Sequence, residues 1–276
     1  MRWHAPAGIL LLFWPCAWGL ILSHNTSWFW WTVFLSGSIV ARTGGVIYND
    51  IIDRYIDRQV SRTQSRPLAC GELNTLQAIF LVFLSLAAGS AYLFLFSFPL
   101  QCLLSFLVVG IALYPFMKRW TSYPQIYLGF LFNMGLWVAA SVQNVFIPWY
   151  YPEYWFFYGG GVAWTLWYDT LYAFQDLEDD KKHNVGSLAV KVADKATVFH
   201  GVMMGVILTF WWAGGQYLYL SSGYNWGLCI LLMTWIVSLF FWPHSSDEQK
   251  YRNLFLFHAW FTGLWITSCL ALYVLL

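Results

Sequence analysis

The 276-residue sequence predicts an all-α membrane protein. Hydrophobic residues make up 59% of the chain, charged residues only 10%, and the mean hydropathy is +0.56. This composition lies outside the range of soluble globular proteins and within that of proteins with several transmembrane segments. We therefore expect the bilayer to surround most of the chain, which we treat as a single integral membrane domain over residues 1–276.

Apolar segments close to the roughly 20 residues that a membrane-spanning helix needs recur along the whole chain. They lie at residues 5–23, 28–48, 75–97, 99–117, 125–147, 154–174, 198–220, 226–242 and 251–276. Each segment predicts one transmembrane helix, so the sequence predicts nine.

Lys and Arg gather in alternate loops, and this bias orients the chain because cytoplasmic loops carry an excess of these residues. The loops at 24–27, 97–98, 148–153 and 221–225 contain no Lys or Arg. The N-terminus is therefore expected in the cytoplasm and the C-terminus outside. No convincing signal-peptide cleavage site follows the first apolar segment, so we expect a protein of the bacterial inner membrane.

Two short clusters rich in carboxylates interrupt this apolar chain, one after the second apolar segment and one after the sixth. The first cluster consists of Asn49, Asp50, Asp53 and Asp57, and the second of Asp176, Asp179 and Asp180. Acidic groups beside a bilayer are costly unless they face water, a partner or an ion. Both clusters are expected on the cytoplasmic side and together predict a functional site that faces the cytoplasm.

The spacing within the first cluster places its side chains on one face of a helix. Asp50, Asp53 and Asp57 are separated by three and then four residues, and Asn49 lies four residues before Asp53. Oxygen ligands of this kind suit Mg²⁺, which binds through one or two carboxylates together with substrate phosphates. The first cluster is therefore a candidate magnesium and diphosphate site.

Basic residues accompany this cluster. Arg54, Arg58 and Arg62 recur every fourth residue on a neighbouring stripe, as expected either for a salt-bridged interfacial helix or for phosphate donors. Arg42 lies inside the apolar segment, where a guanidinium needs an anion. It can pair with one of the aspartates or hold a substrate carboxylate through two hydrogen bonds.

The second cluster extends back into its apolar segment. Asp169, Asp176 and Asp180 are spaced by seven and four residues, and Tyr172 follows Asp169 by three, so we expect all of them on one helical face. This face predicts a second ion site. Because an even number of predicted helices separates the two clusters, they emerge on the same side of the membrane and can face each other across a shared cavity.

A tyrosine and a lysine end the fourth apolar segment. Tyr114 and Lys118 lie one helical turn apart if the helix continues past Pro115. Both side chains can bind a phosphate oxygen, although alone they are also typical of a membrane interface.

Charge and cysteine usage exclude other classes. The net charge is only +1 and the basic residues follow the loops, so we expect no nucleic-acid partner. The five cysteines are far apart and form no CxxC pair, which argues against a zinc site and against a disulfide framework.

Three segments in order carry a resemblance to a known family. From Arg42 to Gly71 the chain reads RTGGVIYNDIIDRYIDRQVSRTQSRPLACG, from Tyr114 it reads YPFMKRWTSYPQIYLGFLFNMG, and from Trp164 it reads WTLWYDTLYAFQDLEDD. These segments resemble the UbiA superfamily of intramembrane aromatic prenyltransferases. The resemblance is closest to the branch of 4-hydroxybenzoate polyprenyltransferases of ubiquinone biosynthesis.

The resemblance implies nine transmembrane helices around a central cavity, two Mg²⁺ ions, a polyprenyl diphosphate donor and prenylation of 4-hydroxybenzoate ortho to its hydroxyl. The metal ligands that it implies are Asn49, Asp50, Asp53, Asp176 and Asp180. Lys118, Tyr114 and Arg58 would bind the diphosphate, with Tyr172 as a further substrate contact. Arg42 or Arg66 would hold the acceptor carboxylate, and Asp57 or Asp169 would take the ring proton. Membrane lipid is the only other partner that we expect.

One stretch departs from this branch. Asn184, Gly186 and Leu188 stand where the branch usually has a VKST-like element, and its lysine is missing, which predicts the loss of one phosphate contact. Two alternatives stay open at this point. One is a UbiA-type enzyme with another acceptor, such as naphthoate, homogentisate or haem. The other is a cation transporter or an inactive scaffold, although transporter sites lie nearer the bilayer midplane.

Overall fold

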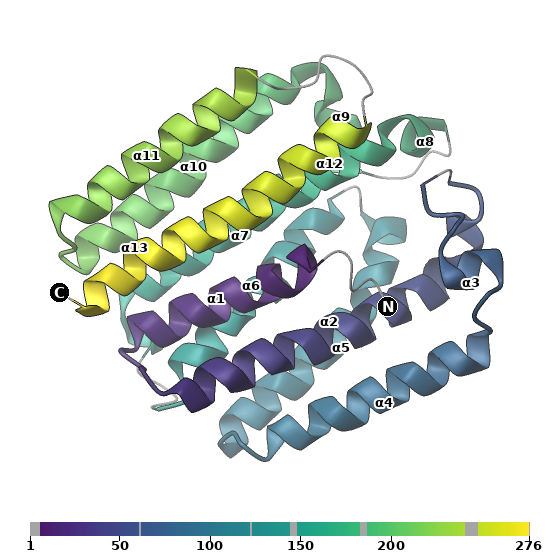
Figure 1. Cartoon of the computed structure of the whole chain (residues 1–276), viewed down its shortest axis with the longest axis horizontal. Coiled ribbons are helices and arrows are strands. Elements are labelled where there is room, and N and C mark those ends of the chain that lie inside the picture. The colour runs from purple at the N-terminus through teal and green to yellow at the C-terminus, as the bar shows by residue number, and fades with distance from the viewer. Residues whose placement is uncertain are drawn as a thin grey trace.

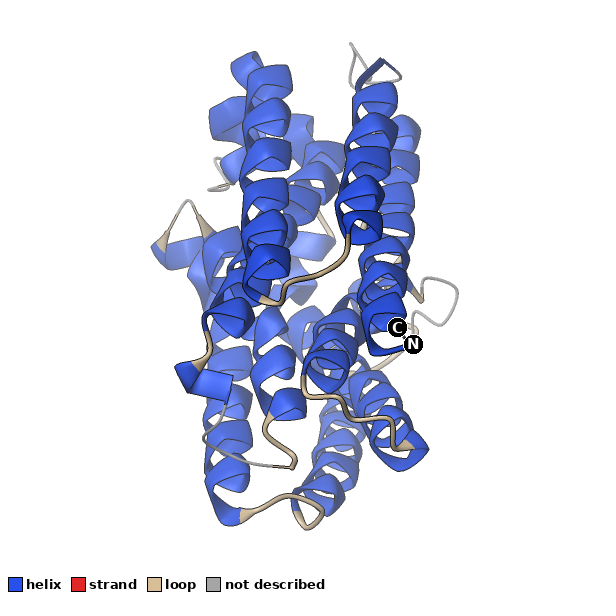
Figure 2. Ribbon diagram, turned by 90° about the vertical axis from the view of Figure 1, so that its left-hand side faces the viewer, coloured by secondary structure: helices blue, strands red, loops and turns tan. Residues whose placement is uncertain are grey.

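The computed structural model describes residues 6–60, 62–121, 123–143, 148–182, 187–240 and 248–275. Within these ranges the chain is helical with short connections and has no β-strand, as Figure 2 shows. The prediction of an all-α protein is therefore confirmed for the part of the chain that the structure describes.

The long helices run roughly side by side along the molecule (Figure 1). They are α1 (Ala7–Leu22), α2 (Trp28–Asp57), α4 (Thr75–Leu93), α5 (Phe98–Trp120), α6 (Pro124–Ala140), α7 (Pro152–Ala173), α10 (Ala196–Tyr217), α11 (Ser222–Phe240) and α13 (Gly263–Leu275). The shorter ones are α3 (Pro67–Cys70), α8 (Leu177–Lys182), α9 (Leu188–Val192) and α12 (Glu248–Phe257). A π-helical turn at His258–Thr262 joins α12 to α13.

Each predicted apolar segment overlaps one of the long helices, although several helices begin earlier or end later than predicted, and not all of them have the composition of a typical transmembrane span. In the described residues, five stretches are long and apolar enough to cross a membrane. They are Thr75–Leu93, Phe98–Met117, Leu188–Tyr217, Ser222–Phe240 and Gln249–Leu272. Helix α1 is apolar but has only 16 residues. The count of nine crossings and the cytoplasmic N-terminus stay predictions.

The core of the bundle is built from α1, α6, α7 and α10. Close approach of α1 and α6 depends on Gly19, because a Cβ atom there would lie 2.3 Å from the carbonyl oxygen of Leu136. The fully buried Trp18 contacts the rings of Trp164 and Trp211 at centroid distances of 5.7 Å. Its indole N–H donates to Thr267 Oγ1 at 2.9 Å, which ties α1 to α13.

The outer helices expose apolar side chains, as expected for a surface that faces lipid. Only 6% of the Thr75–Leu93 span is buried. Phe80, Phe83 and Phe106 are each more than 60% exposed. These outer helices therefore contribute little to the core and separate it from the bilayer.

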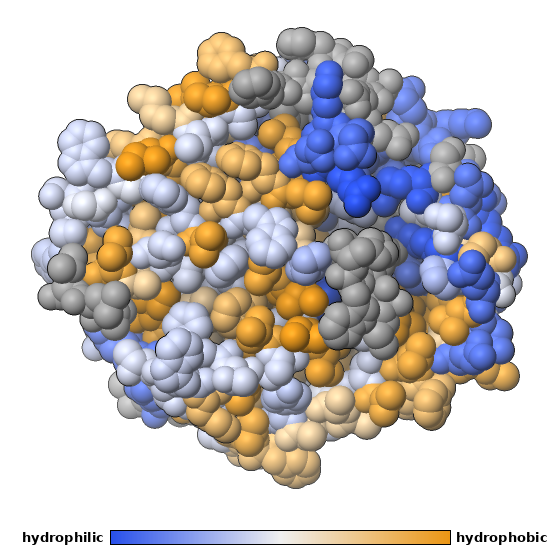
Figure 3. All heavy atoms as spheres, viewed as in Figure 1, coloured by the Kyte–Doolittle hydropathy of each residue, from blue (hydrophilic) through white to orange (hydrophobic). Residues whose placement is uncertain are grey.

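Hydrophilic residues gather over one end of the molecule. Figure 3, which has the viewpoint of Figure 1, shows them over the region of α3 and α8, whereas the C-terminus lies at the opposite end. Helix α2 runs toward this hydrophilic end, and α7 leads into α8 there. The two segments that carry the acidic clusters thus end on the same side of the bundle, as the sequence predicted.

The contact at Gly19 gives a first prediction. The Gly19→Ala substitution should lower stability by about 1–3 kcal/mol, because the added methyl group meets backbone that cannot move cheaply. Thermal unfolding in detergent measures this loss. Gly205→Ala is the matched control, since a Cβ atom there meets nothing within 4 Å. Equal unfolding temperatures for the two variants would contradict the prediction.

Candidate active site

The first acidic cluster lies on the last turns of α2, where the sequence predicted it. The side-chain amide of Asn49 donates to Asp53 Oδ2 at 3.0 Å. Asp53 is 7% exposed and Asp57 is 6% exposed, so both carboxylates are withdrawn from solvent. Because the amide N–H₂ of Asn49 binds Asp53, the residue presents its carbonyl oxygen as a potential ligand.

Helix α2 ends at Asp57, so the prediction of an arginine stripe that continues along this helix is wrong. Arg58 is the C-terminal cap, and its Nε donates to the carbonyl oxygen of Ala69 at 2.9 Å. The hydroxyl of Thr63 donates to the carbonyl oxygen of Asp57 at 3.0 Å and so satisfies a group that a longer helix would use. Arg62 consequently lies in the connection to α3 and not on a helical face.

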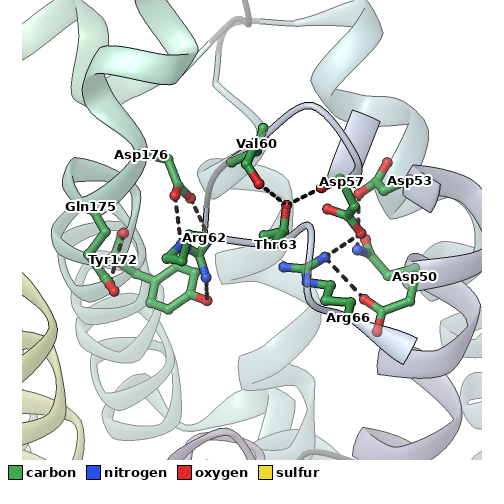
Figure 4. A network of polar contacts seen from close by, with 11 residues as sticks. Asp50, Asp53, Asp57, Val60, Arg62, Thr63, Arg66, Tyr172, Gln175 and Asp176 are labelled. Carbon is green, nitrogen blue, oxygen red and sulfur yellow. Dashed lines mark hydrogen bonds and ion pairs between the residues drawn. The ribbon is translucent and has the colours of Figure 1, made fainter. Parts of the chain in front are cut away.

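Arg66 binds the first cluster from the other end of this connection. Its guanidinium donates to Asp57 Oδ2 at 2.6 Å and to Asp50 Oδ1 at 3.2 Å (Figure 4). The position of Arg66 is fixed because α3 begins directly after it and buries Leu68 in a small core with Ile47. Arg66 is therefore already engaged by two carboxylates of its own chain.

Arg62 binds the second cluster and joins two segments that are 114 residues apart. Its Nε donates to Asp176 Oδ1 at 2.6 Å, and a terminal nitrogen donates to Asp176 Oδ2. The other terminal nitrogen donates to the hydroxyl of Tyr172 at 2.9 Å. Burial opposes the charge of Arg62, but Asp176 and Tyr172 outweigh burial, so the pKa of the guanidinium is raised. Figure 4 shows Arg62 between the two clusters.

The second cluster does not lie on one continuous α-helix, and the shared face of Asp169, Asp176 and Asp180 stays a prediction. Helix α7 ends at Ala173, a tighter 3₁₀ turn follows over Phe174–Asp176, and α8 begins at Leu177. This turn changes the register between the three aspartates. The side-chain amide of Gln175 donates to the carbonyl oxygen of Tyr172 at 3.1 Å and satisfies the helix end.

Helix α12 supports the second cluster, and the sequence analysis missed this role. The ring of Phe255 meets the ring of Tyr172 edge to face at 5.1 Å, and Tyr251 stacks on Phe174 at 5.2 Å. The spacing of four residues between Tyr251 and Phe255, on a polar helix, is a signal that could have indicated a buried face.

A further group of polar residues lies deeper in the bundle. Arg42 of α2 packs against α1 at Gly8, where a Cβ atom would lie 2.4 Å from the arginine Nε. Tyr114 of α5 lies within electrostatic range of Asp169, Arg42 and Asp53. Residues from α2, α5 and α7 therefore converge near Tyr114.

Other predicted positions have different outcomes. Helix α5 continues through Pro115 to Trp120, as the spacing of Tyr114 and Lys118 required. The side chain of Lys118 lies outside the described part of the structure, as do Asn184 and Gly186. Leu188 is buried at the start of α9.

The oxygen atoms of these clusters fit a Mg²⁺ ion whose remaining ligands come from a bound phosphate. Within the described ranges, no three His, Cys, Asp or Glu side chains come together to hold an ion by themselves. Each cluster offers one or two carboxylates, and the first adds the amide oxygen of Asn49. Mg²⁺ is commonly bound in this way, with substrate phosphates and water completing its shell.

The fold and the site together define a helical membrane protein with two acidic clusters at its hydrophilic end, each of which is bound by an arginine of the connection between α2 and α3. The UbiA prenyltransferase family model matches residues 12–274. The 4-hydroxybenzoate octaprenyltransferase of Vibrio campbellii is 35% identical over 257 residues, which cover 92% of this chain and 87% of that protein. The enzyme of the same name from Hydrogenovibrio crunogenus is 36% identical over 265 residues, with coverages of 92% and 89%. The chain therefore belongs to the UbiA prenyltransferase family, so it is a prenyltransferase.

Solved structures agree on the fold. A UbiA homologue from Aeropyrum pernix K1 superposes with a TM-score of 0.79 at 21% identity, covering 96% of this chain and 97% of its own. A UbiA homologue from Archaeoglobus fulgidus, bound to GPP and Mg²⁺, superposes with a TM-score of 0.65 at 14% identity and the same coverages. The resemblance inferred from the three sequence segments is thus confirmed.

The contacts of Arg66 give a second prediction. The Arg66→Gln substitution should destabilise the connection between α2 and α3 locally by about 1–3 kcal/mol, because Asp50 and Asp57 lose a charged donor. Hydrogen–deuterium exchange of peptides that cover residues 58–70 measures this change. Arg54→Gln is the control, since Arg54 donates to the hydroxyls of Thr75 and Tyr55. If exchange rose equally in both variants, general loss of charge would explain it.

Proposed function

We propose that this protein transfers a polyprenyl group from a polyprenyl diphosphate to the ring of 4-hydroxybenzoate, ortho to its hydroxyl, in ubiquinone biosynthesis. The observation that carries this proposal is that two acidic clusters lie at the same end of a UbiA fold, where Arg62 ties the connection that follows the first cluster to Asp176 of the second. Relatives named 4-hydroxybenzoate octaprenyltransferase, which match 92% of the chain, support this acceptor over naphthoate, homogentisate or haem. The alternation of loops with and without Lys or Arg supports a site that faces the cytoplasm from a bacterial inner membrane.

In this proposal, Asn49, Asp50, Asp53, Asp176 and Asp180 are the residues that hold Mg²⁺. The bound metal would supply a counter-charge for the pyrophosphate leaving group. Two structures of a UbiA homologue from Archaeoglobus fulgidus with this fold hold Mg²⁺ and a prenyl diphosphate, GPP in one and DMAPP in the other, which supports the same ligands here. The hydrogen bond from Asn49 holds the Asp53 carboxylate in a fixed orientation.

Basic and phenolic groups would bind the diphosphate oxygens. Arg58 donates from its Nε to the carbonyl oxygen of Ala69, and its terminal nitrogens would donate to a phosphate at the end of α2. Lys118 and Tyr114 would donate from α5, and Tyr172 from α7. These donors would stabilise the negative charge that grows as the bond between the prenyl carbon and oxygen breaks.

The acceptor would lie deeper, beside Arg42. Of the two arginines that the sequence offered for its carboxylate, we choose Arg42, because it belongs to the group of polar residues near Tyr114 and Asp169, whereas Arg66 lies on Asp50 and Asp57 at the end of α2. Asp57 and Asp169 are the two candidates to accept the ring proton. We choose Asp169, because it lies in the same deeper group of residues near Tyr114 as Arg42.

The reaction is then a substitution with balanced bonds. The C–O bond of the donor breaks and its electron pair leaves with pyrophosphate. A C–C bond forms at the ring carbon ortho to the hydroxyl, and the proton of that carbon passes to Asp169. The faces of buried aromatic rings can stabilise positive charge on the prenyl carbon.

A third prediction tests the reaction and its metal. In liposomes with 4-hydroxybenzoate and a polyprenyl diphosphate, product should form with Mg²⁺ and cease with a chelator. Asp53→Asn should lower kcat at least about a hundred-fold, because it removes a charge that acts on the leaving group. Glu178→Gln is the matched control, since Glu178 is exposed on α8. Absence of product with donors of several chain lengths would refute the proposed acceptor.

A fourth prediction tests the acceptor clamp. Arg42→Gln should raise KM for 4-hydroxybenzoate by about ten-fold or more while the KM for the donor changes little, because one charged hydrogen-bond partner is worth about 1.5–3 kcal/mol. Initial rates with each substrate varied in turn separate the two constants. A rise in the donor constant alone would assign Arg42 to the diphosphate.

A further inference from the structure

The contact between Arg62 and Asp176 has a consequence for the order in which ligands bind. Arg62 uses both oxygens of the carboxylate, and the two side chains are only 25% and 19% exposed. Asp176 is also one of the residues assigned above to Mg²⁺. The same two oxygens thus have two competing cationic partners.

We propose that Arg62 is an internal counter-ion that occupies Asp176 until a diphosphate displaces it, so that Mg²⁺ and the prenyl donor bind together. This inference rests on the proposed function and deepens it. Arg62 acts as a positioning residue: it controls which partner the Asp176 carboxylate has and ties the connection between α2 and α3 to the second acidic cluster in the absence of substrate.

Mg²⁺ would compete with Arg62 for the carboxylate of Asp176. A metal ion that approaches either oxygen of Asp176 meets the positive charge of Arg62 at hydrogen-bonding distance. The repulsion acts in a partly buried site, where water screens it less than at the surface. Mg²⁺ alone must therefore expel Arg62 from a bidentate contact with no new anion to receive it.

Several interactions hold Arg62 in its resting contact with Asp176. Arg62 donates three hydrogen bonds, because one terminal nitrogen also donates to the hydroxyl of Tyr172 at 2.9 Å. The guanidinium lies 5.1 Å from the centre of the Tyr172 ring, which adds a cation–π contact. The ring is itself braced by Phe255. A metal ion offers Arg62 no replacement for these partners.

A bound diphosphate would release Arg62 from Asp176. A diphosphate presents several charged oxygens that match the fork of a guanidinium, so it can receive Arg62 when Asp176 turns to the metal. The backbone beside Arg62 stays anchored by the bond from Thr63 to Asp57. The exchange is therefore a movement of one side chain and leaves the connection between α2 and α3 in place.

The test measures binding of Mg²⁺ alone, by isothermal titration calorimetry on the full chain in detergent. Arg62→Gln should bind Mg²⁺ about ten-fold more tightly than the wild type, whereas the control Arg54→Gln should not. Adding Asp176→Asn to Arg62→Gln should cancel the gain, since the freed carboxylate is then absent. Equal or weaker binding by Arg62→Gln would overturn the proposal.

A second titration uses geranyl S-thiolodiphosphate, a non-reactive donor analogue. The analogue should tighten Mg²⁺ binding by a smaller factor in Arg62→Gln than in the wild type. Because coupling is reciprocal, Mg²⁺ should tighten binding of the analogue by the same factor in each protein. If Arg62→Gln does not fold, Arg62→Lys serves the same purpose, because it keeps the charge but loses the fork and should give a smaller gain in Mg²⁺ affinity.

These readouts are independent of turnover. Tighter Mg²⁺ binding by Arg62→Gln in a protein that prenylates no 4-hydroxybenzoate would refute the proposed acceptor and keep the counter-ion. Normal turnover with unchanged Mg²⁺ affinity in Arg62→Gln would refute the counter-ion and keep the proposed function.

Discussion

The need to neutralise carboxylates at the end of an apolar bundle dominates the structure of this site. Two clusters of aspartates lie at the same end of the bundle, where the helices end. Two arginines of the connection between α2 and α3 bind them: Arg66 binds the first cluster and Arg62 binds the second. Unpaired charges at such a place cost far more than the paired ones, because part of their hydration is lost. The path of the chain from the end of α2 to the start of α3 follows from this pairing.

The sequence predicted the parts of the molecule that depend on local pattern. Apolar length located the long helices, and residue spacing placed Asn49, Asp50, Asp53 and Asp57 on the last turns of α2. The helix ends were harder, because side chains from the following loop decide them: Thr63 takes the carbonyl of Asp57, and Gln175 takes that of Tyr172. Such hydrogen bonds carry no periodic signal, so a regular spacing suggested longer helices than the chain forms.

Long-range partners were the other part that pattern could not give. Arg62 has the same spacing from Arg58 as an interfacial arginine would have, yet it binds a residue 114 positions away. The different positions of Arg42 and Arg66 also needed the fold, since only the structure places Arg66 on Asp50 and Asp57 at the end of α2 and Arg42 beside Gly8 of α1. Gly8 is a similar case. Only the structure shows that a side chain at this position would collide with Arg42, which fills the space beside it.

Charge balance explains why internal arginines suit a site for a diphosphate. An acidic site without counter-ions repels an anionic donor, while one filled with metal in advance depends on the free metal concentration. Arg62 and Arg66 keep the carboxylates neutralised before the donor arrives. In the proposed exchange, Asp176 would be able to hold Mg²⁺ once Arg62 has passed to the oxygens of the bound diphosphate, so Asp176 keeps a cationic partner and Arg62 keeps an anionic one. Neither the resting nor the loaded site then leaves a charge unpaired beside the membrane, which is the condition that the position of these clusters imposes.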